Sequence, residues 1–301
     1  MSATPASSGV TVEQPGVYDL PADVYHADPV PGGSLSASGA KRLLPPSCPA
    51  LYHYWSQRQE HKDAFDFGHA AHAEVLGVGA PIAVVDAKDW RTKAAQQKQA
   101  DAYAAGHTPL LKADHERVYA MAAALRAHPF AADLFRPGTG QAEQALFWVD
   151  EEFGVWRRAM LDWIPHAPSP SGLLIGDYKS TPCADPGAIA KSIANYSYLQ
   201  QAAWYEDAVR AVGLADDPVF LFVFQEKTPP YLVTVVQPKP YVIEWGRRLN
   251  RKALDVWRRC READHWPGYA DEVVSVGLPG WTEAQYQAAW DRGDLDVGDP
   301  T

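Results

Sequence analysis

Hydrophobic positions change their spacing along the chain, and each change predicts a different kind of element. Up to about residue 130 the apolar residues recur at the spacing of amphipathic helices. From about residue 144 to residue 179 they form short apolar or alternating runs, which are typical of strands. Helical spacing then returns, interrupted by two further strand-like runs. This order predicts a block of helices, a group of strands, and then helices and strands in alternation.

The first block predicts four helices after a polar N-terminal stretch. Residues up to about 20 are small and polar, so we expect them to be loosely held. A serine cap favours the start of the first helix, and Gly106 and Pro129 favour the ends of the last two. The helices are expected over residues 34–44, 65–76, 90–106 and 112–127, with loops at 45–49 and 165–172.

Five strands and three further helical stretches are expected in the remainder of the chain. Phe153-Gly154 is a hairpin signal between the first two strands, and residues 228–230 (TPP) predict a turn between the last two. The spacing of Thr282 and Gln285 predicts a capping box for the last helix. Strands are expected over 144–149, 155–163, 173–179, 219–224 and 231–236, and helices over 186–212, over 241–263 and after 282.

This order of elements predicts a mixed α/β fold, in which helices pack on a central mixed sheet. The chain is expected to form one continuous unit rather than two independent ones. Within it we distinguish an N-terminal segment (1–63) that packs on the core, a core (64–265) with a helical insertion (86–130), and an acidic tail (266–301).

Acidic residues stand at the ends of two neighbouring predicted strands. Asp177 and Lys179 follow an apolar run and point to the same side, because side chains alternate along a strand. If the preceding strand pairs with this one, its Asp162 meets Asp177 at one end of the sheet. Two nearby carboxylates repel each other unless one is protonated or a cation neutralises them, and oxygen ligands suit Mg²⁺ or Mn²⁺. The alternatives are a surface ion pair, and an Asp162 that only caps the turn at Pro165.

Two predicted helices offer further polar groups. Small residues from Gly68 onward would let one helix approach the sheet, so that His72 reaches the metal. Gln201 and Tyr205 lie four residues apart and share one helical face, which suits contacts to a phosphate or to a ligating carboxylate. The alternatives are a structural histidine and an ordinary amphipathic surface helix.

The order of these motifs resembles that of RecB-type nucleases of the PD-(D/E)XK superfamily, and most closely the RecE (exonuclease VIII) branch found on phages and prophages. Supporting segments lie at residues 25–28, 35–38, 90–129 and 226–231, and the resemblance covers about residues 17 to 263. The motifs that carry it are Gly68-x-x-x-His72, Asp162, Asp177-Tyr178-Lys179-Ser180-Thr181 and Tyr198-x-x-Gln201-x-x-x-Tyr205.

The resemblance implies a PD-(D/E)XK nuclease core and a role for each matching residue. It implies that Mg²⁺ or Mn²⁺ is bound by His72, Asp162, Asp177 and the backbone carbonyl of Tyr178. Glu143 would bind a second metal ion through water. Lys179 would orient the attacking water and stabilise charge. Gln201 and Tyr205 would support the reaction near the scissile phosphate.

The resemblance further implies an activity and partners. The expected enzyme is a magnesium-dependent exodeoxyribonuclease that degrades duplex DNA from its ends, 5′ to 3′, in a recombination system with a single-strand annealing protein. A ring-shaped homo-oligomer and a cytoplasmic location, in the host cell if the chain is phage-encoded, belong to the same expectation. The alternatives are another PD-(D/E)XK nuclease (an endonuclease or a single-strand exonuclease) and a DNA-end-binding module whose catalysis has decayed.

The charge balance complicates a DNA-binding function. The chain has 27 Lys and Arg against 37 Asp and Glu, a net charge of -10, which disfavours broad nonspecific binding of nucleic acid. Local basic groups can override this sum, and a basic stripe over residues 247–261 is equally compatible with a DNA track and a solvated helix face. Candidate DNA contacts are Arg157, Arg158, Arg247, Arg248, Arg251 and Arg258.

Three other features limit the possible functions. The three cysteines (Cys48, Cys183 and Cys260) are too few for the four-cysteine iron–sulfur cluster that some RecB-type nucleases carry, so no cluster is expected. The longest apolar run, 219–224, is far shorter than the roughly 20 residues that cross a membrane, so no membrane span is expected. No phosphate loop or GxGxxG pattern points to a nucleotide-binding enzyme.

Overall fold

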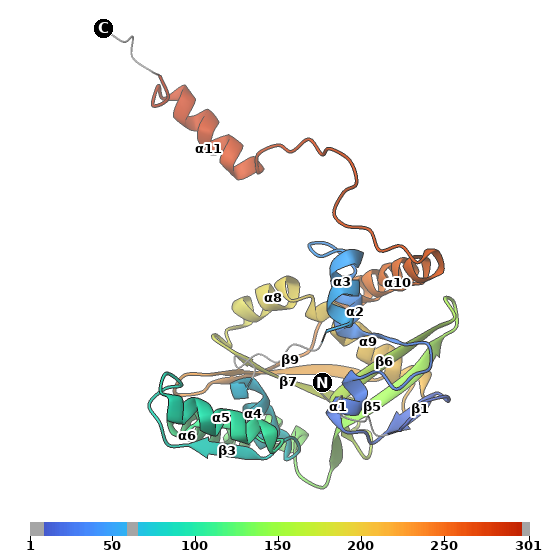
Figure 1. The fold of residues 1–301 in the computed structure, drawn as a ribbon, viewed down its shortest axis with the longest axis vertical. Coiled ribbons are helices and arrows are strands. Elements are labelled where there is room, and N and C mark those ends of the chain that lie inside the picture. The colour runs from blue at the N-terminus through green and yellow to red at the C-terminus, as the bar shows by residue number, and fades with distance from the viewer. Residues whose placement is uncertain (1–8, 59–65, 297–301) are drawn as a thin grey trace.

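The computed structural model describes residues 9–58 and 66–296. Within them, a seven-stranded mixed sheet runs through the centre of the body (Figure 1), in the order β1-β5-β6-β7-β8-β9, with β2 paired to β6. The strands are β1 (Gly16–Tyr18), β2 (Leu35–Ser36), β5 (Gly140–Asp150), β6 (Val155–Pro165), β7 (Leu174–Thr181), β8 (Val219–Glu226) and β9 (Val233–Val236).

The sheet is built from a hairpin followed by a crossover. Strands β5 and β6 pair antiparallel, and Gly154 makes their turn with a φ of 62° while its N–H donates to the Asp150 carbonyl. Strand β7 pairs antiparallel with β6 but parallel with β8, so the chain must cross over between β7 and β8. That crossover carries the helices α8 (Pro186–Asn195) and α9 (Tyr198–Ala211).

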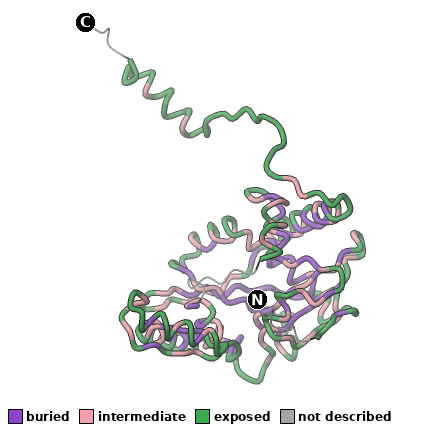
Figure 2. Tube along the Cα trace, in the orientation of Figure 1, coloured by how far each residue is buried: buried purple, intermediate pink, exposed green. Residues whose placement is uncertain are grey.

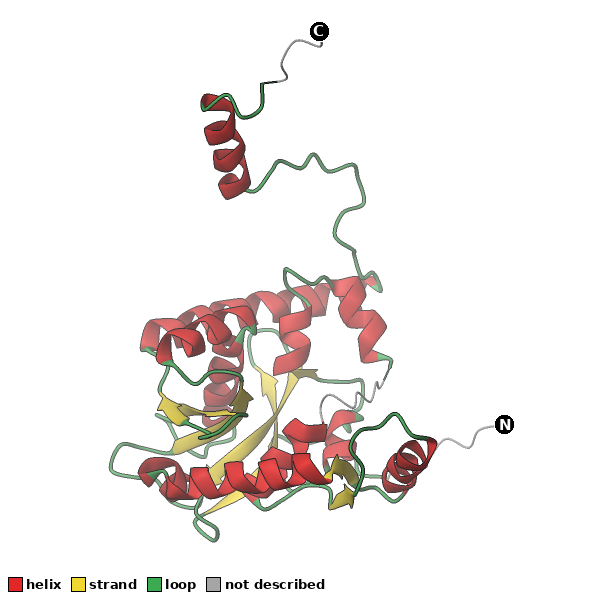
Figure 3. Cartoon of the chain, turned by 90° about the vertical axis from the view of Figure 1, so that its left-hand side faces the viewer, coloured by secondary structure: helices red, strands yellow, loops and turns green. Residues whose placement is uncertain are grey.

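Helices cover both faces of the sheet, and each face buries its own apolar cluster (Figures 2 and 3). Helix α9, fully buried at Trp204, covers one face together with α2 (Ala37–Arg42), α3 (Pro49–Ser56), α8 and α10 (Pro240–Ala263). The other face is covered by α4 (Asp66–Leu76), α6 (Lys112–Ala127) and α7 (Pro129–Leu134).

The remaining elements lie at the edges of this body. Helix α1 (Ala22–His26) follows β1, and the short parallel pair β3 (Ile82–Val85) and β4 (Thr108–Leu111) flanks α5 (Lys93–Ala104). Helix α11 (Gly280–Asp291) lies away from the body at the end of an extended segment (Figure 1). No helix among the described residues combines the length and the apolar character needed to span a membrane.

The mixed α/β architecture expected from the sequence is confirmed, and so are its five strands and its first four helices. Three local expectations are wrong. The stretch 186–212 is two helices, because Ser197 adopts a left-handed φ of 51° that ends one helix and redirects the chain. No capping box forms at Thr282, because α11 begins two residues earlier, after Pro279. The stretch before residue 20 is not loose throughout, because Val12 is fully buried and β1 pairs with β5.

Candidate active site

Two aspartates meet where β6 and β7 pair. The register aligns Trp163 with Gly176, which brings Asp162 next to Asp177 across the two antiparallel strands. The carboxylate of Asp162 accepts the backbone N–H of Tyr178 at 2.9 Å. Asp162 therefore ties the two strands together at this point, and the alternative in which it only caps the turn at Pro165 is not what the structure shows.

Asp177 is held by partners on both of its oxygens. Its side chain is completely buried, and the Lys179 ammonium, two residues along the same strand, forms an ion pair with Oδ2. The side-chain amide of Gln201, on α9, donates to Oδ1 at 2.7 Å. Burial raises the pKa of Asp177 to about 6, and the negative charge of Asp162 acts in the same direction, whereas Lys179 opposes them.

His72 reaches this pair from α4 on the opposite side of the strands. Its Nε2 lies 3.0 Å from Oδ2 of Asp162, and its Nδ1 lies 3.5 Å from Oε1 of Glu143. Burial alone would lower the pKa of His72, but the two carboxylates outweigh it and raise the pKa to about 10. In this arrangement the cationic imidazole partly neutralises the acidic cluster.

Glu143 occupies a strained position within β5. Its φ of 50° is left-handed, whereas its neighbours Ala142 and Gln144 keep regular antiparallel pairing with β6. Such a conformation costs on the order of 1–3 kcal/mol for a residue other than glycine, and it is common at functional sites. The distortion lies at the point of β5 that is opposite Asp162 and accompanies the contact between Glu143 and His72.

Part of this cluster lines a cavity of about 500 Å³, whereas the fully buried Asp177 does not reach it. Tyr205 lines it beside Gln201, as their spacing on α9 predicts, and its ring packs edge-on against Phe220 with centroids 5.9 Å apart. Burial raises the pKa of the Tyr205 hydroxyl well above its ordinary value, so this group stays protonated and can donate a hydrogen bond. The site residues on this cavity wall are His72, Glu143, Asp162, Gln201 and Tyr205.

One pair of donor atoms in this cluster has the spacing that a small divalent ion requires of adjacent ligands. Ligands at about 2.1 Å from Mg²⁺ lie roughly 3 Å apart when adjacent, and the 3.0 Å between His72 Nε2 and Asp162 Oδ2 matches that spacing. Asp177 is engaged by Lys179 and Gln201, and no three His, Cys, Asp or Glu side chains of the described residues are placed together as metal ligands. The chemistry of the group, with one imidazole and buried carboxylates, suits a divalent ion.

Arg157 and Arg158, which precede Asp162 on β6, are held by the fold. The guanidinium of Arg157 lies over the rings of both Trp148 and Trp204 and pairs with Asp150 at 3.0 Å, with 5% of its side chain exposed. The expectation that Arg157 contacts DNA disagrees with this burial. Arg158 pairs with Asp28 at 2.6 Å but also lines a surface cavity.

The basic stripe on α10 is largely neutralised by acids of the same chain. Each of its four candidate arginines has a carboxylate partner, so the stripe is less positive than the sequence indicates. The pairs are Arg247 with Asp207 (3.0 Å), Arg248 with Glu244 (3.0 Å), Arg251 with Glu152, and Arg258 with Glu262 (2.7 Å). A solvated, internally paired helix face agrees better with these contacts than a DNA track does.

The structure adds one residue, Lys41, that the sequence motifs did not place in the site. Lys41, on α2, lines the site cavity, and its Nζ lies 5.1 Å from the ring centroid of Tyr198. The Nζ of Lys179 lies 5.3 Å from the same ring, so the two ammonium groups flank one aromatic side chain. Lys41 precedes Lys179 by more than a hundred residues, and no local motif links the two.

The mixed sheet, the Asp162–Asp177 pair and the adjacent Lys179 agree with the fold and residue arrangement expected of the PD-(D/E)XK class. The sequence model of the PDDEXK-like domain of unknown function (DUF3799) matches residues 36–277. The chain belongs to this family.

One solved structure supports the same fold. It is a protein from Eubacterium rectale whose description reads "Putative exonuclease", with a TM-score of 0.55 and 13% sequence identity. The match covers 94% of this chain and 100% of the other. No curated protein matches the sequence.

Proposed function

We propose that this protein is a divalent-metal-dependent exodeoxyribonuclease that hydrolyses phosphodiesters from the ends of duplex DNA. The observation that carries the proposal is the assembly of His72, Asp162, Asp177 and Lys179 from two strands and a helix into one cluster around the buried Asp177. An imidazole, two carboxylates and an ammonium group are the groups that metal-assisted phosphodiester hydrolysis requires.

The proposed ligands are His72, Asp162, Asp177 and the backbone carbonyl of Tyr178, with Mg²⁺ or Mn²⁺ as the ion and Glu143 as a water-mediated ligand of a second one. A bound divalent ion supplies an activated water and neutralises charge on the scissile phosphate. His72 must give up its proton to act as a ligand, since only neutral imidazole binds metal.

The chain's own groups position the remaining reactants. Although burial opposes it, Asp177 and Asp162 raise the pKa of Lys179, which keeps its ammonium charged beside the ligands. This ammonium is placed to orient the attacking water and to offset the negative charge that develops in the transition state. The hydrogen bond from Gln201 holds Asp177 in place. The Tyr205 hydroxyl, which lines the cavity, would donate a hydrogen bond to the phosphate.

The finer features of the proposal rest on the resemblance to the RecE branch. They are 5′ to 3′ polarity, a role in recombination beside a single-strand annealing protein, a ring-shaped homo-oligomer, and action in the cytoplasm. The description of the Eubacterium rectale structure agrees with an exonuclease.

Digestion of end-labelled linear duplex and of covalently closed circular duplex tests the proposal. We expect the wild-type protein with Mg²⁺ to degrade only the linear DNA, and chelator or Asp177→Ala to abolish degradation. Release of the 5′ label before the 3′ label would establish the polarity. Cleavage of the circle would show an endonuclease instead, and equal signals with and without chelator would refute metal dependence.

A further inference from the structure

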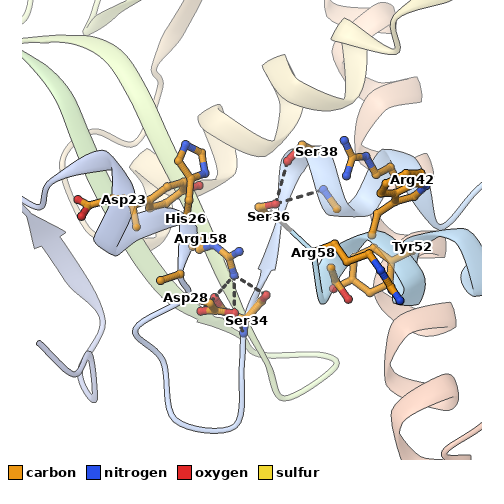
Figure 4. A pocket seen from close by; sticks show the side chains of 15 residues that line it. Asp23, His26, Asp28, Ser34, Ser36, Ser38, Arg42, Tyr52, Arg58 and Arg158 are labelled. Carbon is orange, nitrogen blue, oxygen red and sulfur yellow. Dashed lines mark hydrogen bonds and ion pairs between the residues drawn. The ribbon is translucent and has the colours of Figure 1, made fainter. Parts of the chain in front are cut away.

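Helix α2 forms the wall between two surface cavities. One is the site cavity described above. The other, of about 640 Å³, contains Arg42, Arg58 and Arg158 (Figure 4). Successive residues of a helix point about 100° apart, so Lys41 faces the site cavity while Arg42 faces the second one. Both cavities are lined by Tyr25, His26, Ser36 and Ser38, and together they form what we call the α2 trough.

Three cations of the trough have no carboxylate partner among the described residues. They are Lys41, Arg42 and Arg58, in contrast with the paired arginines of α10. The Arg58 guanidinium lies 3.7 Å from the ring centroid of Tyr54 and donates to the Tyr54 carbonyl, which leaves its positive charge uncompensated. The side chains of Arg42 and Arg58 are exposed and accessible to a ligand.

Three of the four acids that line the trough already have partners. Glu143 and Asp162, in the site cavity, contact His72. Asp28 is occupied by the Arg158 guanidinium at 2.6 Å and by the N–H and hydroxyl of Ser34, each at 2.7 Å. Asp23 is the other acid that lines the second cavity. The remaining polar groups there include the hydroxyls of Ser36, Ser38 and Tyr52, which can donate to phosphate oxygens as guanidinium groups do.

We propose that a single DNA strand leading to the active site runs along the α2 trough, with its phosphates on Lys41, Arg42 and Arg58, and not along α10. The inference deepens the proposed function and rests on it for the identity of the ligand. It offers a way for an acidic chain to hold DNA, because three cations without a carboxylate partner among the described residues line cavities next to the site.

Binding without hydrolysis tests the trough directly. The probe is a short fluorescein-labelled DNA single strand in chelator, followed by anisotropy over a series of salt concentrations. We expect the double variant Arg42→Ala/Arg58→Ala to bind the strand about tenfold more weakly. Each lost phosphate contact should also reduce the salt slope, which is the slope of the logarithm of the binding constant against the logarithm of the salt concentration, by about 0.7 in magnitude. The lysine variants Arg42→Lys and Arg58→Lys should recover most of the slope, which a merely structural role would not.

Arg259→Ala is the matched control, because Arg259 is an exposed α10 arginine paired with Asp255 at 2.9 Å. Its affinity and salt slope should equal those of the wild type, and melting temperatures check that every variant is folded. Unchanged binding in the double variant, or an equal loss in Arg259→Ala, overturns the inference. Digestion of linear DNA by the wild type separates the two proposals. If the wild type digests DNA but the trough variants bind the strand as tightly as the wild type does, the trough proposal alone is refuted. If the wild type shows salt-dependent binding at the trough but no digestion, the nuclease proposal alone is refuted.

Discussion

Replacing Gln201 by leucine removes one hydrogen bond at the centre of the site. The Gln201 amide donates to Asp177 Oδ1 at 2.7 Å, and Lys179 lies on the other oxygen, so Oδ1 loses its donor. Asp177 is fully buried, so water does not replace the amide. A hydrogen bond to a charged group contributes about 1.5–3 kcal/mol. If this free energy is lost from the transition state, kcat falls by a factor of roughly 10 to 100.

The adjacent Gln200 provides the matched control. It is equally buried on α9, but its amide donates to Asn250 on α10 at 3.2 Å, away from the site. Gln200→Leu should therefore lower stability and leave the reaction unchanged in the protein that remains folded. Gln201→Leu should lower kcat for linear DNA and weaken Mn²⁺ binding measured by calorimetry, with KM little altered.

The two variants together decide whether Gln201 is a positioning residue. If Gln201→Leu lowers the melting temperature as Gln200→Leu does but keeps wild-type kcat and Mn²⁺ affinity, the reasoning is refuted. An equal loss of kcat in both variants would refute it too, because the effect would then be a general loss of packing in α9.

Three further predictions concern groups around the site. Arg157→Met should lower the free energy of unfolding in urea by about 3 kcal/mol, because it leaves a partly buried acid without its partner and removes the cation from two tryptophan rings. Arg251→Met, which breaks an exposed pair, should lower it by less than about 1 kcal/mol, and equal losses would contradict this. Burial lowers the pKa of Lys41 to about 8, so the affinity of the wild type for single-stranded DNA should fall between pH 7 and pH 9. The Lys41→Arg variant stays charged over this range and should keep its affinity, and an equal fall in both proteins would contradict the prediction. Ser197→Gly should raise the free energy of unfolding by about 0.5–1 kcal/mol and Ser197→Val should lower it, because glycine adopts this left-handed φ without strain. A glycine variant less stable than the wild type would refute the argument.

Local sequence determined the elements that carry the site. An apolar run that ends in Asp177-Tyr178-Lys179 predicts a buried strand with two polar side chains on one side, and the ion pair between Asp177 and Lys179 follows from the two-residue period of a strand. The four-residue spacing of Gln201 and Tyr205 likewise placed both on one helix face and in one cavity. These periods are properties of the backbone, so the sequence alone expresses them.

Charge compensation was decided by tertiary structure. The arginines of 247–261 form a basic stripe in sequence. Their acidic partners include Asp207 on α9 and Glu152 in the β5–β6 turn, and because these acids lie on other elements, the sequence of the helix does not reveal them. Arg157 likewise is a buried ion packed against two tryptophan rings. The joining of Lys41 to Lys179 across Tyr198, and of His72 to Asp162, also depended on how distant elements pack. Periodicity specifies which side of an element a residue occupies, but the group that it meets there depends on the packing of the whole chain.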